Sequence, residues 1–525
     1  MKTVGIPSMK EDTMREVTTK SVKLNRDLDK MLDQALERDL LVRIGWGKQG
    51  DEKPKNGEIG VITHLPEKSR VLLLGELGEC AGAMNQGGTF TLQGSCTSML
   101  GAFQENGRIT VERDSGDRTG YRMSGGEIVI QGSTGEKTGS GLRGGSIIIR
   151  GHARSKCGTG MKGGSIIVLG NVGPEPGYGM TGGKIIVAGN CSTPGEGAMM
   201  RNISSEEIEE FSQILEPQGF QIDSDALVIV PTEDNICEEK IPKRTIIEGF
   251  ENISLVPSSA EVIDKSTTLE IESTILPAGL NENGLLLPIP WIVNLENVDN
   301  KIGEKSTQPC LVSSNPKEND LLLIGEENIV GSSNLISNCS GIVLDLISLS
   351  ELNDAEIEAT LVSLYSRMRD DSLVFIRGSV SRVERIFRLV VDLDLDGAII
   401  DVSTPGGNRA ASSLPRIGLV SRAMNLSSQG RTIMIQINKT PTAEDLLIAR
   451  GAGCMAIVSP PSEEKLELTI KTLNSSIRGW MRELGANNLF EINRSNLRAM
   501  DQDTAAISGL RLIGYDRPLP MWLKN

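Results

Sequence analysis

The stretch Met161-Lys-Gly-Gly-Ser-Ile-Ile-Val-Leu-Gly170 decides the first half of the fold, because near copies of it recur at a constant spacing. The four clearest copies begin at residues 123, 142, 161 and 180, so that each starts 19 residues after the one before it. Earlier and weaker copies lie at Asn106–Val111, Gly87–Gly94 and Val71–Gly75. A register that holds through about seven copies indicates a structural repeat.

Each copy consists of a glycine pair, a short run of β-branched or apolar residues, and a closing glycine. Of the 58 glycines in the chain, 30 lie between Gly75 and Gly189. A unit of this length is too short for a strand and a helix, but it suits one coil of a parallel β-helix, in which glycine provides the corners. One coil cannot bury a core alone, so the array folds as a unit. We predict a right-handed parallel β-helix over residues 61–200, preceded by a helical or extended cap over residues 1–60.

Three segments of the array also match the dinucleotide-binding fingerprint Gly-x-Gly-x-x-Gly. They are Gly139–Gly144, Gly158–Gly163 and Gly177–Gly182. A true fingerprint occurs once, between a strand and a long helix, whereas these matches recur every 19 residues. We therefore interpret them as corners of the coils rather than as a nucleotide site.

Charge and composition exclude several classes of function. The 525 residues carry a net charge of −15, so we expect neither nucleic acid nor an anionic membrane as a partner. The chain has only two histidines, His64 and His152, and its eight cysteines include no Cys-x-x-Cys pair, so we expect no metal site and no iron–sulfur cluster. No secretory signal is evident and the longest apolar stretch, Leu285–Val293, is too short to cross a membrane, which predicts a cytoplasmic protein.

The repeat stops after residue 200, and a different pattern follows. Residues 201–268 read as a connector that begins with an amphipathic helix at Ser204–Leu215. Apolar segments then predict eight strands, at Leu285–Val293, Cys310–Ser313, Leu321–Gly325, Gly341–Ile347, Leu373–Gly378, Gly397–Ser403, Thr432–Asn438 and Cys454–Ser459. Amphipathic helices are predicted at Asp354–Met368, Ser381–Val391, Pro415–Met424, Thr442–Gly451 and Glu463–Leu484. This alternation over residues 269–525 favours a degenerate (β/α)₈ barrel with short connections in its first three units, and the alternative is an open doubly wound sheet.

The array from Leu28 to Gly189 resembles the GXGXG domain that closes the large subunit of glutamate synthase. The same domain occurs as a separate subunit of N-methylglutamate synthase and is related to one of the subunits of formylmethanofuran dehydrogenase. The resemblance rests on the Gly-Gly-Ile-Ile-Val-x-Gly unit, which recurs in register. It implies a β-helix that braces catalytic domains and associates with partner subunits.

The second half resembles, more weakly, the FMN-binding barrel of glutamate synthase. The similar segments are Asp396–Asn408, Ala443–Val458 and the tail beginning at Asn496. The family grips the flavin phosphate with glycine-rich turns after the seventh and eighth strands, but here these turns read Asn-Lys-Thr-Pro-Thr (438–442) and Ser-Pro-Pro-Ser (459–462). Proline has no N–H to donate to a phosphate. The cysteines of the family's cluster are also absent, and the chain begins Met-Lys rather than with the cysteine of a glutaminase, so we expect no glutaminase here.

Candidate cofactor-binding residues gather at or just after the ends of the later strands of the predicted barrel. They are Arg377, Gly406, Gly407 and Lys439. All four would lie at the C-terminal face, where barrel enzymes bind their ligands, as would Asp401. The alternative is that the glycines form an ordinary turn and the charges are solvated. No catalytic residue is predicted, and neither histidine is accompanied by a nucleophile or carboxylate pattern.

These observations lead to a functional hypothesis with two alternatives. We expect a scaffold, regulatory or assembly subunit of a glutamate-synthase-type complex in nitrogen metabolism, a pseudoenzyme with a degraded flavin site and no bound cofactor. The first alternative is a diverged FMN-dependent oxidoreductase acting on CH–NH₂ donors. A weaker alternative is a subunit of C1 metabolism like that of formylmethanofuran dehydrogenase. The expected partners are protein subunits of such a complex, or further copies of this chain.

Overall fold

The computed structural model divides the chain into two compact units. The repeat unit comprises residues 15–241 and 352–366, and the barrel unit includes residues 242–351 and 367–525. Within them the structure describes residues 16–46, 54, 57–216, 219–232, 250, 252–257, 263–264, 266–277, 284–296, 307–403, 410–462 and 466–514.

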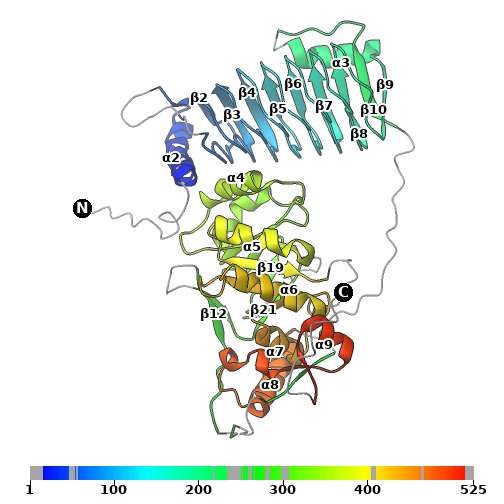
Figure 1. Ribbon diagram of the computed structural model, residues 1–525. Coiled ribbons are helices and arrows are strands. Elements are labelled where there is room, and N and C mark those ends of the chain that lie inside the picture. The colour runs from blue at the N-terminus through cyan, green and yellow to red at the C-terminus, as the bar shows by residue number, and fades with distance from the viewer. Residues whose placement is uncertain are drawn as a thin grey trace, which may run out of the picture. The chain divides into compact units, whose positions relative to one another are not determined.

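The repeat unit is built on one large sheet (Figure 1). Its strands are β1 (Val42–Ile44), β2 (Arg70–Leu74), β3 (Gln86–Gln93), β4 (Asn106–Val111), β5 (Glu127–Ile130), β6 (Ser146–Ile149), β7 (Lys162–Val168), β8 (Gly182–Val187), β9 (Ala198–Asn202) and β10 (Leu227–Pro231). Strands β1 to β8 pair in parallel and in chain order, while β10 pairs antiparallel with both β8 and β9. Ile128 pairs with Ile147, which pairs with Ile166. The predicted 19-residue register is therefore confirmed.

A second line of pairing joins the same repeats away from the sheet. Its parallel bridges run from Glu58 through Leu77, Cys96, Ser115, Thr134, Ala153 and Val172 to Cys191. Between this line and the sheet the chain turns through left-handed residues, among them Gly139 (φ +67°) and Gly141 (φ +66°). Because β6 and not a helix follows these glycines, the interpretation of the Gly-x-Gly-x-x-Gly matches as corners is confirmed.

Each of the strands β5 to β8 buries apolar side chains on both of its faces. The inward residues stack into one core, which includes Ile128, Ile147, Ile166 and Ile185. The outward residues Val129, Ile148, Ile167 and Ile186 form a second apolar stripe. Helix α3 (Ser205–Leu215) lies beside the last of these strands (Figure 1), and its Phe211 and Leu215 pack into the stripe. Ser204 caps this helix with a complete capping box, so the predicted helix and its start are confirmed.

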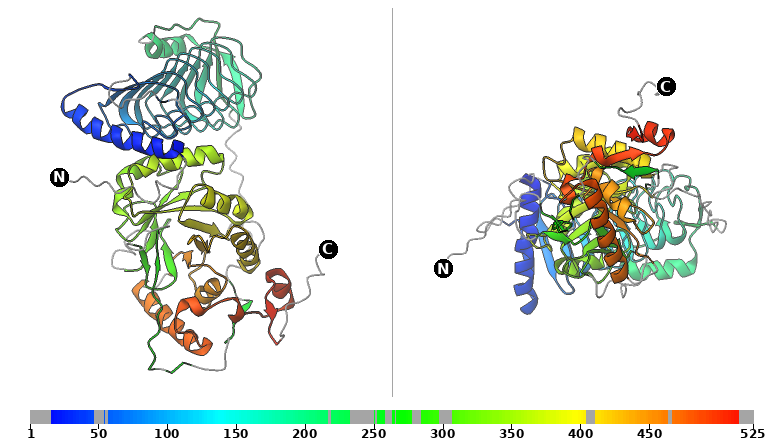
Figure 2. Two further views of the ribbon diagram at one scale, coloured as in Figure 1. Left: turned by 60° about the vertical axis from the view of Figure 1, so that its left-hand side comes forward. Right: turned by 90° about the horizontal axis from the view of Figure 1, so that it is seen from below.

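Two helices pack side by side along the repeats (Figure 2). They are α2 (Glu16–Glu37) and α4 (Asp354–Tyr365), and α4 belongs to the repeat unit although the chain order puts it between two barrel strands. The amide of Asn25 on α2 donates to the carbonyl oxygen of Gly60 (2.7 Å) and accepts from the N–H of Ile62 (2.9 Å). Thr18 donates to Glu358 on α4 (2.8 Å), so buried polar contacts join α2 both to the repeats and to α4.

The barrel unit is a closed barrel of eight parallel strands. They are β14 (Trp291–Asn294), β15 (Cys310–Val312), β16 (Leu321–Ile324), β17 (Gly341–Asp345), β18 (Leu373–Ser379), β19 (Gly397–Asp401), β20 (Thr432–Gln436) and β21 (Ala456–Ser459). Its helices are α5 (Val383–Asp392), α6 (Ala410–Ala423), α7 (Ala443–Gly451), α8 (Leu466–Leu484) and α9 (Gln502–Ser508). Pairing of β21 with β14 closes the ring. The barrel prediction is confirmed and the open sheet is wrong.

The predicted strand Leu285–Val293 is corrected to two strands. Its first part, β13 (Leu285–Leu287), pairs antiparallel with β12 (Ser273–Ile275) outside the ring, and only its second part contributes to β14. Pro288 and Pro290 stand between them, and proline cannot donate to a strand ladder. Ile275, Leu285 and Leu287 instead pack into the apolar core of the barrel.

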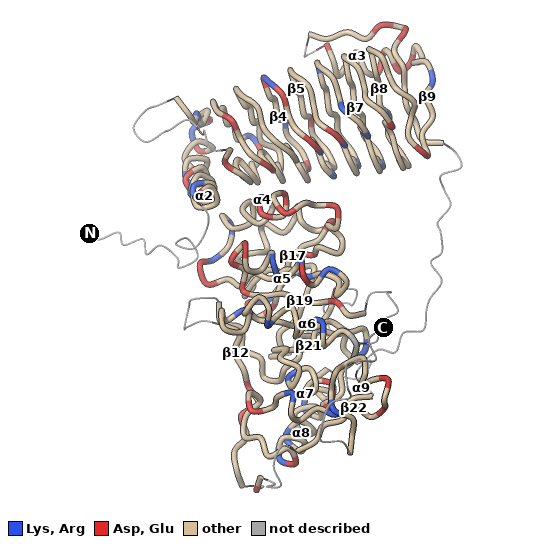
Figure 3. Tube along the Cα trace, in the orientation of Figure 1, with Lys and Arg blue, Asp and Glu red and all other residues tan. Residues whose placement is uncertain are grey.

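The remaining described strands form a small sheet of β11 (Ile253–Leu255), β22 (Leu497–Ala499) and β23 (Arg511–Leu512). Acidic and basic residues are interspersed over both units rather than gathered in one basic stripe (Figure 3). None of the helices in the described ranges is both long and apolar enough to cross a membrane.

Candidate functional site

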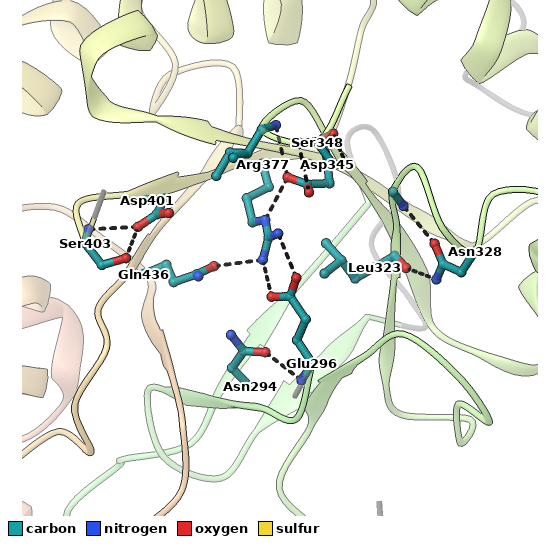
Figure 4. Close-up of polar contacts among 12 residues, drawn as sticks. Asn294, Glu296, Leu323, Asn328, Asp345, Ser348, Arg377, Asp401, Ser403 and Gln436 are labelled. Atoms are coloured by element: carbon teal, nitrogen blue, oxygen red, sulfur yellow. Dashed lines mark hydrogen bonds and ion pairs between the residues drawn. The ribbon is translucent and has the colours of Figure 1, made fainter. Parts of the chain in front are cut away.

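A polar layer covers the apolar core of the barrel at the C-terminal ends of its strands. Side chains alternate across a strand, so the residue two positions after an inward apolar residue also faces inward. The pairs are Val343 and Asp345 on β17, Phe375 and Arg377 on β18, Ile399 and Asp401 on β19, and Met434 and Gln436 on β20. Figure 4 shows these polar side chains converging with Glu296, which follows β14.

Arg377 is at the centre of this polar layer, and its side chain is only 5% exposed. Its terminal nitrogens contact both carboxylate oxygens of Glu296 at 2.7 and 3.1 Å, and its Nε donates to Asp345 at 2.9 Å (Figure 4). Gln436 accepts a longer hydrogen bond of 3.5 Å. Burial opposes the charge, but the hydrogen bonds and charges of Glu296 and Asp345 outweigh it and raise the pKa of Arg377. The positive charge of the guanidinium is therefore balanced by the carboxylates of Glu296 and Asp345.

Asp401 adds a third carboxyl group to the layer. It is 5% exposed, and it accepts hydrogen bonds from the backbone N–H of Ser403 at 2.8 Å and from the Ser403 hydroxyl. Burial raises the pKa of Asp401, and the bonds from Ser403 and the charge of Arg377 offset this only in part. Perturbed carboxyl groups of this kind are common at functional sites.

The four predicted cofactor-binding residues have different outcomes. Arg377 lies in the polar layer, whereas Lys439 pairs with Asp445 at the first turn of α7 (3.5 Å). Gly406 and Gly407 lie outside the described residues. That these residues bind a cofactor stays a prediction.

The turns after the seventh and eighth strands of the barrel are linked to each other. The Thr440 hydroxyl, in the turn after β20, donates to the carbonyl oxygen of Pro460, in the turn after β21, at 3.3 Å. Each turn also contains proline, which offers no N–H.

Asp345, Gln436 and Glu296 are site residues that the sequence analysis does not single out. The two-residue alternation along β17 and β20 is a usable signal for Asp345 and Gln436. Glu296 has no such signal, because it follows its strand and reaches Arg377 only when the ring is closed.

The histidines have structural contacts. The Nε2 atom of buried His64 lies 3.2 Å from the carbonyl oxygen of Ser363 on α4. His152 accepts a hydrogen bond at Nδ1 from the N–H of Asn171, 19 residues later, at 2.9 Å. Asp114, Ser133 and Asn171 accept in the same way from the residue one repeat further along. His152 is therefore one step of a polar ladder along the stacked repeats.

Within the part of the chain that the structure describes, no group of three or more His, Cys, Asp or Glu side chains is arranged to hold a metal ion. Burial raises the pKa of Cys96, Cys157 and Cys454 to about 12. These thiols stay protonated at neutral pH and are poor nucleophiles.

Comparison with known proteins identifies the repeat region of the chain. No curated protein matches the sequence. Residues 61–217 match the family model described as the GXGXG motif, and this range runs from the first repeats through α3. The repeat region is thus a GXGXG motif domain, a domain found in the large subunit of glutamate synthase.

Proposed function

We propose that this protein is a scaffold or assembly subunit of a glutamate-synthase-type complex in amino-acid nitrogen metabolism, with a barrel whose flavin site is degraded. The GXGXG match supports the relationship. The observation that carries the proposal is the closed ion-pair set of Arg377, Glu296 and Asp345 at the barrel mouth.

A flavin phosphate would need a cation or bare N–H groups at this face. An arginine has five N–H donors, and the contacts of Arg377 involve its Nε and both terminal nitrogens. A phosphate could reach this guanidinium only by displacing Glu296 or by standing beside two carboxylates. Either change is unfavourable, because it would separate or crowd the carboxylates that balance the charge of the buried Arg377.

The turns after β20 and β21 support the same proposal. Lys439 is held by Asp445, and the Thr440–Pro460 hydrogen bond links the two turns at the place where the family's phosphate would lie. Bare backbone N–H groups are what such sites use to bind a phosphate, and prolines 441, 460 and 461 provide none.

We also propose that the repeats wind as a right-handed parallel β-helix. Two lines of parallel pairing, both with a 19-residue period, support a coil that closes on its neighbours. In such a coil the backbone bonds of each repeat go to the adjacent repeats, which makes a stiff body against which partner subunits can assemble.

A second candidate is a diverged FMN-dependent oxidoreductase. The raised pKa of Asp401, beside Arg377 and Gln436, favours it, because perturbed ionisable groups at the C-terminal face of a barrel are typical of active sites. A buried carboxyl group with a raised pKa is a candidate for proton transfer to the nitrogen of an imine. In that function Asp401 would act on the substrate, while Arg377 and Gln436 would orient it.

Two measurements on the full chain test these candidates. In an FMN titration followed by flavin fluorescence, we expect no uptake by the wild type, and a gain only in Glu296→Gln, which weakens the hold on Arg377. Glu384→Gln is the matched control, because its partner Arg416 lies on the surface. Uptake of about one equivalent by the wild type would overturn the scaffold proposal and favour the oxidoreductase.

The second measurement adds the chain to a glutamate synthase catalytic chain that lacks its own GXGXG domain. We expect a defined complex by light scattering and a higher rate of glutamine-dependent glutamate formation than for the catalytic chain alone. If neither the assembly nor the rate changes, the scaffold proposal fails.

A further inference from the structure

A second feature of the barrel unit lies beside the polar layer and has no role in the proposed function. It is a cavity of about 220 Å³ at the C-terminal ends of β17 and β18. Its lining includes Ile347, Ser379, Ser381, Arg382, Arg385 and Ile386. Gly378 also lines it and alternates along β18 with the inward Arg377, so the cavity opens on the outer side of this strand.

The charge of the lining favours an anion. Two arginines contribute to it, and none of the described residues around the cavity is acidic. On the same elements, Asp345 pairs with Arg377 and Glu384 pairs with Arg416. A lining whose described residues include two arginines and no carboxylate attracts anions.

Arg382 is positioned by the loop after β17. Its Nη1 donates to the carbonyl oxygen of Ser350, another lining residue, at 3.3 Å, which uses one of its five donors. Arg382 is also the N-cap residue of α5 and makes no side-chain cap, so the positive end of this helix lies at the same wall. Arg385 is one turn further along the helix, so that both guanidinium groups can reach one anion.

Serine hydroxyls add donors of the kind that phosphate oxygens accept. The hydroxyl oxygens of Ser379 and Ser381 lie 3.0 Å apart, and Ser379 also accepts from the N–H of Ser381. The opposite part of the wall is apolar, with Ile347 and Ile386. A Cβ added at Gly378 would lie 2.5 Å from the Cδ1 of Ile386, so strand and helix meet closely and this wall is fixed.

We propose that this cavity binds a small phosphomonoester, with its phosphate at Arg382, Arg385 and Ser381 and its carbon chain against Ile347 and Ile386. Pockets for drug-sized ligands span roughly 300–1,000 Å³, so this smaller cavity fits a short phosphorylated metabolite rather than a flavin nucleotide. The site stands apart from the polar layer, and the proposal holds for either function considered above.

Titration calorimetry on the full chain tests the proposal with three probes: glycerol 3-phosphate, inorganic phosphate and glycerol. We expect one glycerol 3-phosphate to bind per chain, inorganic phosphate to bind more weakly, and glycerol to show no heat. The double variant Arg382→Gln/Arg385→Gln should weaken binding of glycerol 3-phosphate at least tenfold, and Ser381→Ala should weaken it less. Arg388→Gln should leave it unchanged, because Arg388 is exposed on the same helix and pairs with Asp392.

Three outcomes would overturn the proposal. They are an absence of binding by glycerol 3-phosphate, unchanged binding in the double variant, and equal affinities for glycerol 3-phosphate and inorganic phosphate. The last would show an anion site that makes no use of the apolar wall. Circular dichroism of each variant confirms that a loss of binding is not a loss of fold.

Discussion

Arg377 and Glu296 form a two-point ion pair, with nitrogen–oxygen distances of 2.7 and 3.1 Å, although 81 residues separate them in the chain. Glu296 follows the first strand of the barrel and Arg377 lies on the fifth, so the pair spans the mouth of the ring. Asp345 completes the set from the fourth strand. A charge set of this kind adds little net stability, but removing one member leaves a buried charge uncompensated.

Asp345→Asn tests the ion-pair set through stability. Asp345 accepts from Arg377 and also from the N–H groups of Ile347 and Ser348, and it is almost fully buried. We expect the free energy of unfolding of the barrel unit to fall by about 3 kcal/mol. Urea unfolding followed by tryptophan fluorescence measures it, since Trp291 is buried in this unit.

The control for this change is Asp392→Asn, which removes an exposed carboxylate 3.9 Å from Arg388. Exposed pairs contribute little, so we expect a change within about 0.5 kcal/mol. Equal effects of the two substitutions would mean that Arg377 does not depend on Asp345.

Gly139→Ala and Gly160→Ala separate backbone strain from steric clash in the repeats. Both glycines are left-handed, with φ of +67° and +62°. A Cβ at Gly139 would lie 2.4 Å from the Cδ1 of Ile166, whereas a Cβ at Gly160 meets nothing within 4 Å. We expect Gly160→Ala to cost about 1–2 kcal/mol from strain alone. Gly139→Ala should cost about 1–3 kcal/mol more, because the core has no room for the added methyl group.

Calorimetric unfolding of the repeat unit measures both substitutions. Similar losses for the two variants would contradict the close packing of the corner against Ile166. A tolerated Gly160→Ala would contradict its left-handed backbone.

Most of the architecture could be predicted from the sequence, because it follows from the local periodicity of glycine and apolar residues. A 19-residue repeat with glycine pairs predicts stacking wherever it occurs, and pairs such as Ile147 with Ile166 follow directly from it. The eight barrel strands follow from apolar runs, which alternate with helices in the later part of the barrel. The second apolar stripe, through Ile148 and Ile167, could also have been found, since the repeats carry isoleucine at adjacent positions.

The parts that could not be predicted depend on contacts between distant segments. Prolines 288 and 290 do mark a break, but only the closed ring shows that β13 packs into the barrel core. The place of α4 in the repeat unit depends on contacts such as the ion pair of Arg118 with Glu356, 238 residues apart. In the candidate site, the sequence places Arg377 at the end of a predicted strand, but its ion pair with Glu296 forms only in the folded ring.

Glu207 makes the stability of α3 sensitive to acid. It accepts from both terminal nitrogens of Arg201 at 2.7 Å, from the N–H of Ser204 and from Lys184. The pKa of Glu207 is held well below its usual range, and the hydrogen bonds from Arg201 are the largest cause. A depressed folded-state pKa contributes stability that is complete above the unfolded value, about 4.3, and is lost as the pH falls toward the folded value.

Glu207→Gln should therefore lower the stability of the repeat unit by about 2 kcal/mol at pH 7 and flatten its decline between about pH 5 and pH 2. Glu210→Gln is the control, because Glu210 is mostly exposed and pairs with the same Lys184 at 3.3 Å. Urea unfolding across this range measures both. Parallel acid profiles for wild type and Glu207→Gln would show that this carboxylate is not the source of the sensitivity.

Asp401→Asn is expected to stabilise the barrel unit at neutral pH. Because burial raises the pKa of Asp401, the folded state holds the proton more tightly than the unfolded chain does. The resulting stability is complete below the unfolded pKa of about 3.9 and is lost as the pH rises through the folded value. Asparagine does not ionise, so we expect a gain of about 1 kcal/mol at pH 7 that disappears near pH 4.

Urea unfolding at the two pH values measures this gain, and Asp371→Asn, which removes a partly exposed carboxylate paired with Arg369, should show none. A loss of stability at pH 7 would instead mean that the bonds from Ser403 and the charge of Arg377 outweigh burial. If the gain is found, the barrel mouth retains a carboxyl group that weakens the fold. The scaffold proposal expects Asp401→Asn to assemble like the wild type, whereas under the second candidate Asp401→Asn would be the inactive variant.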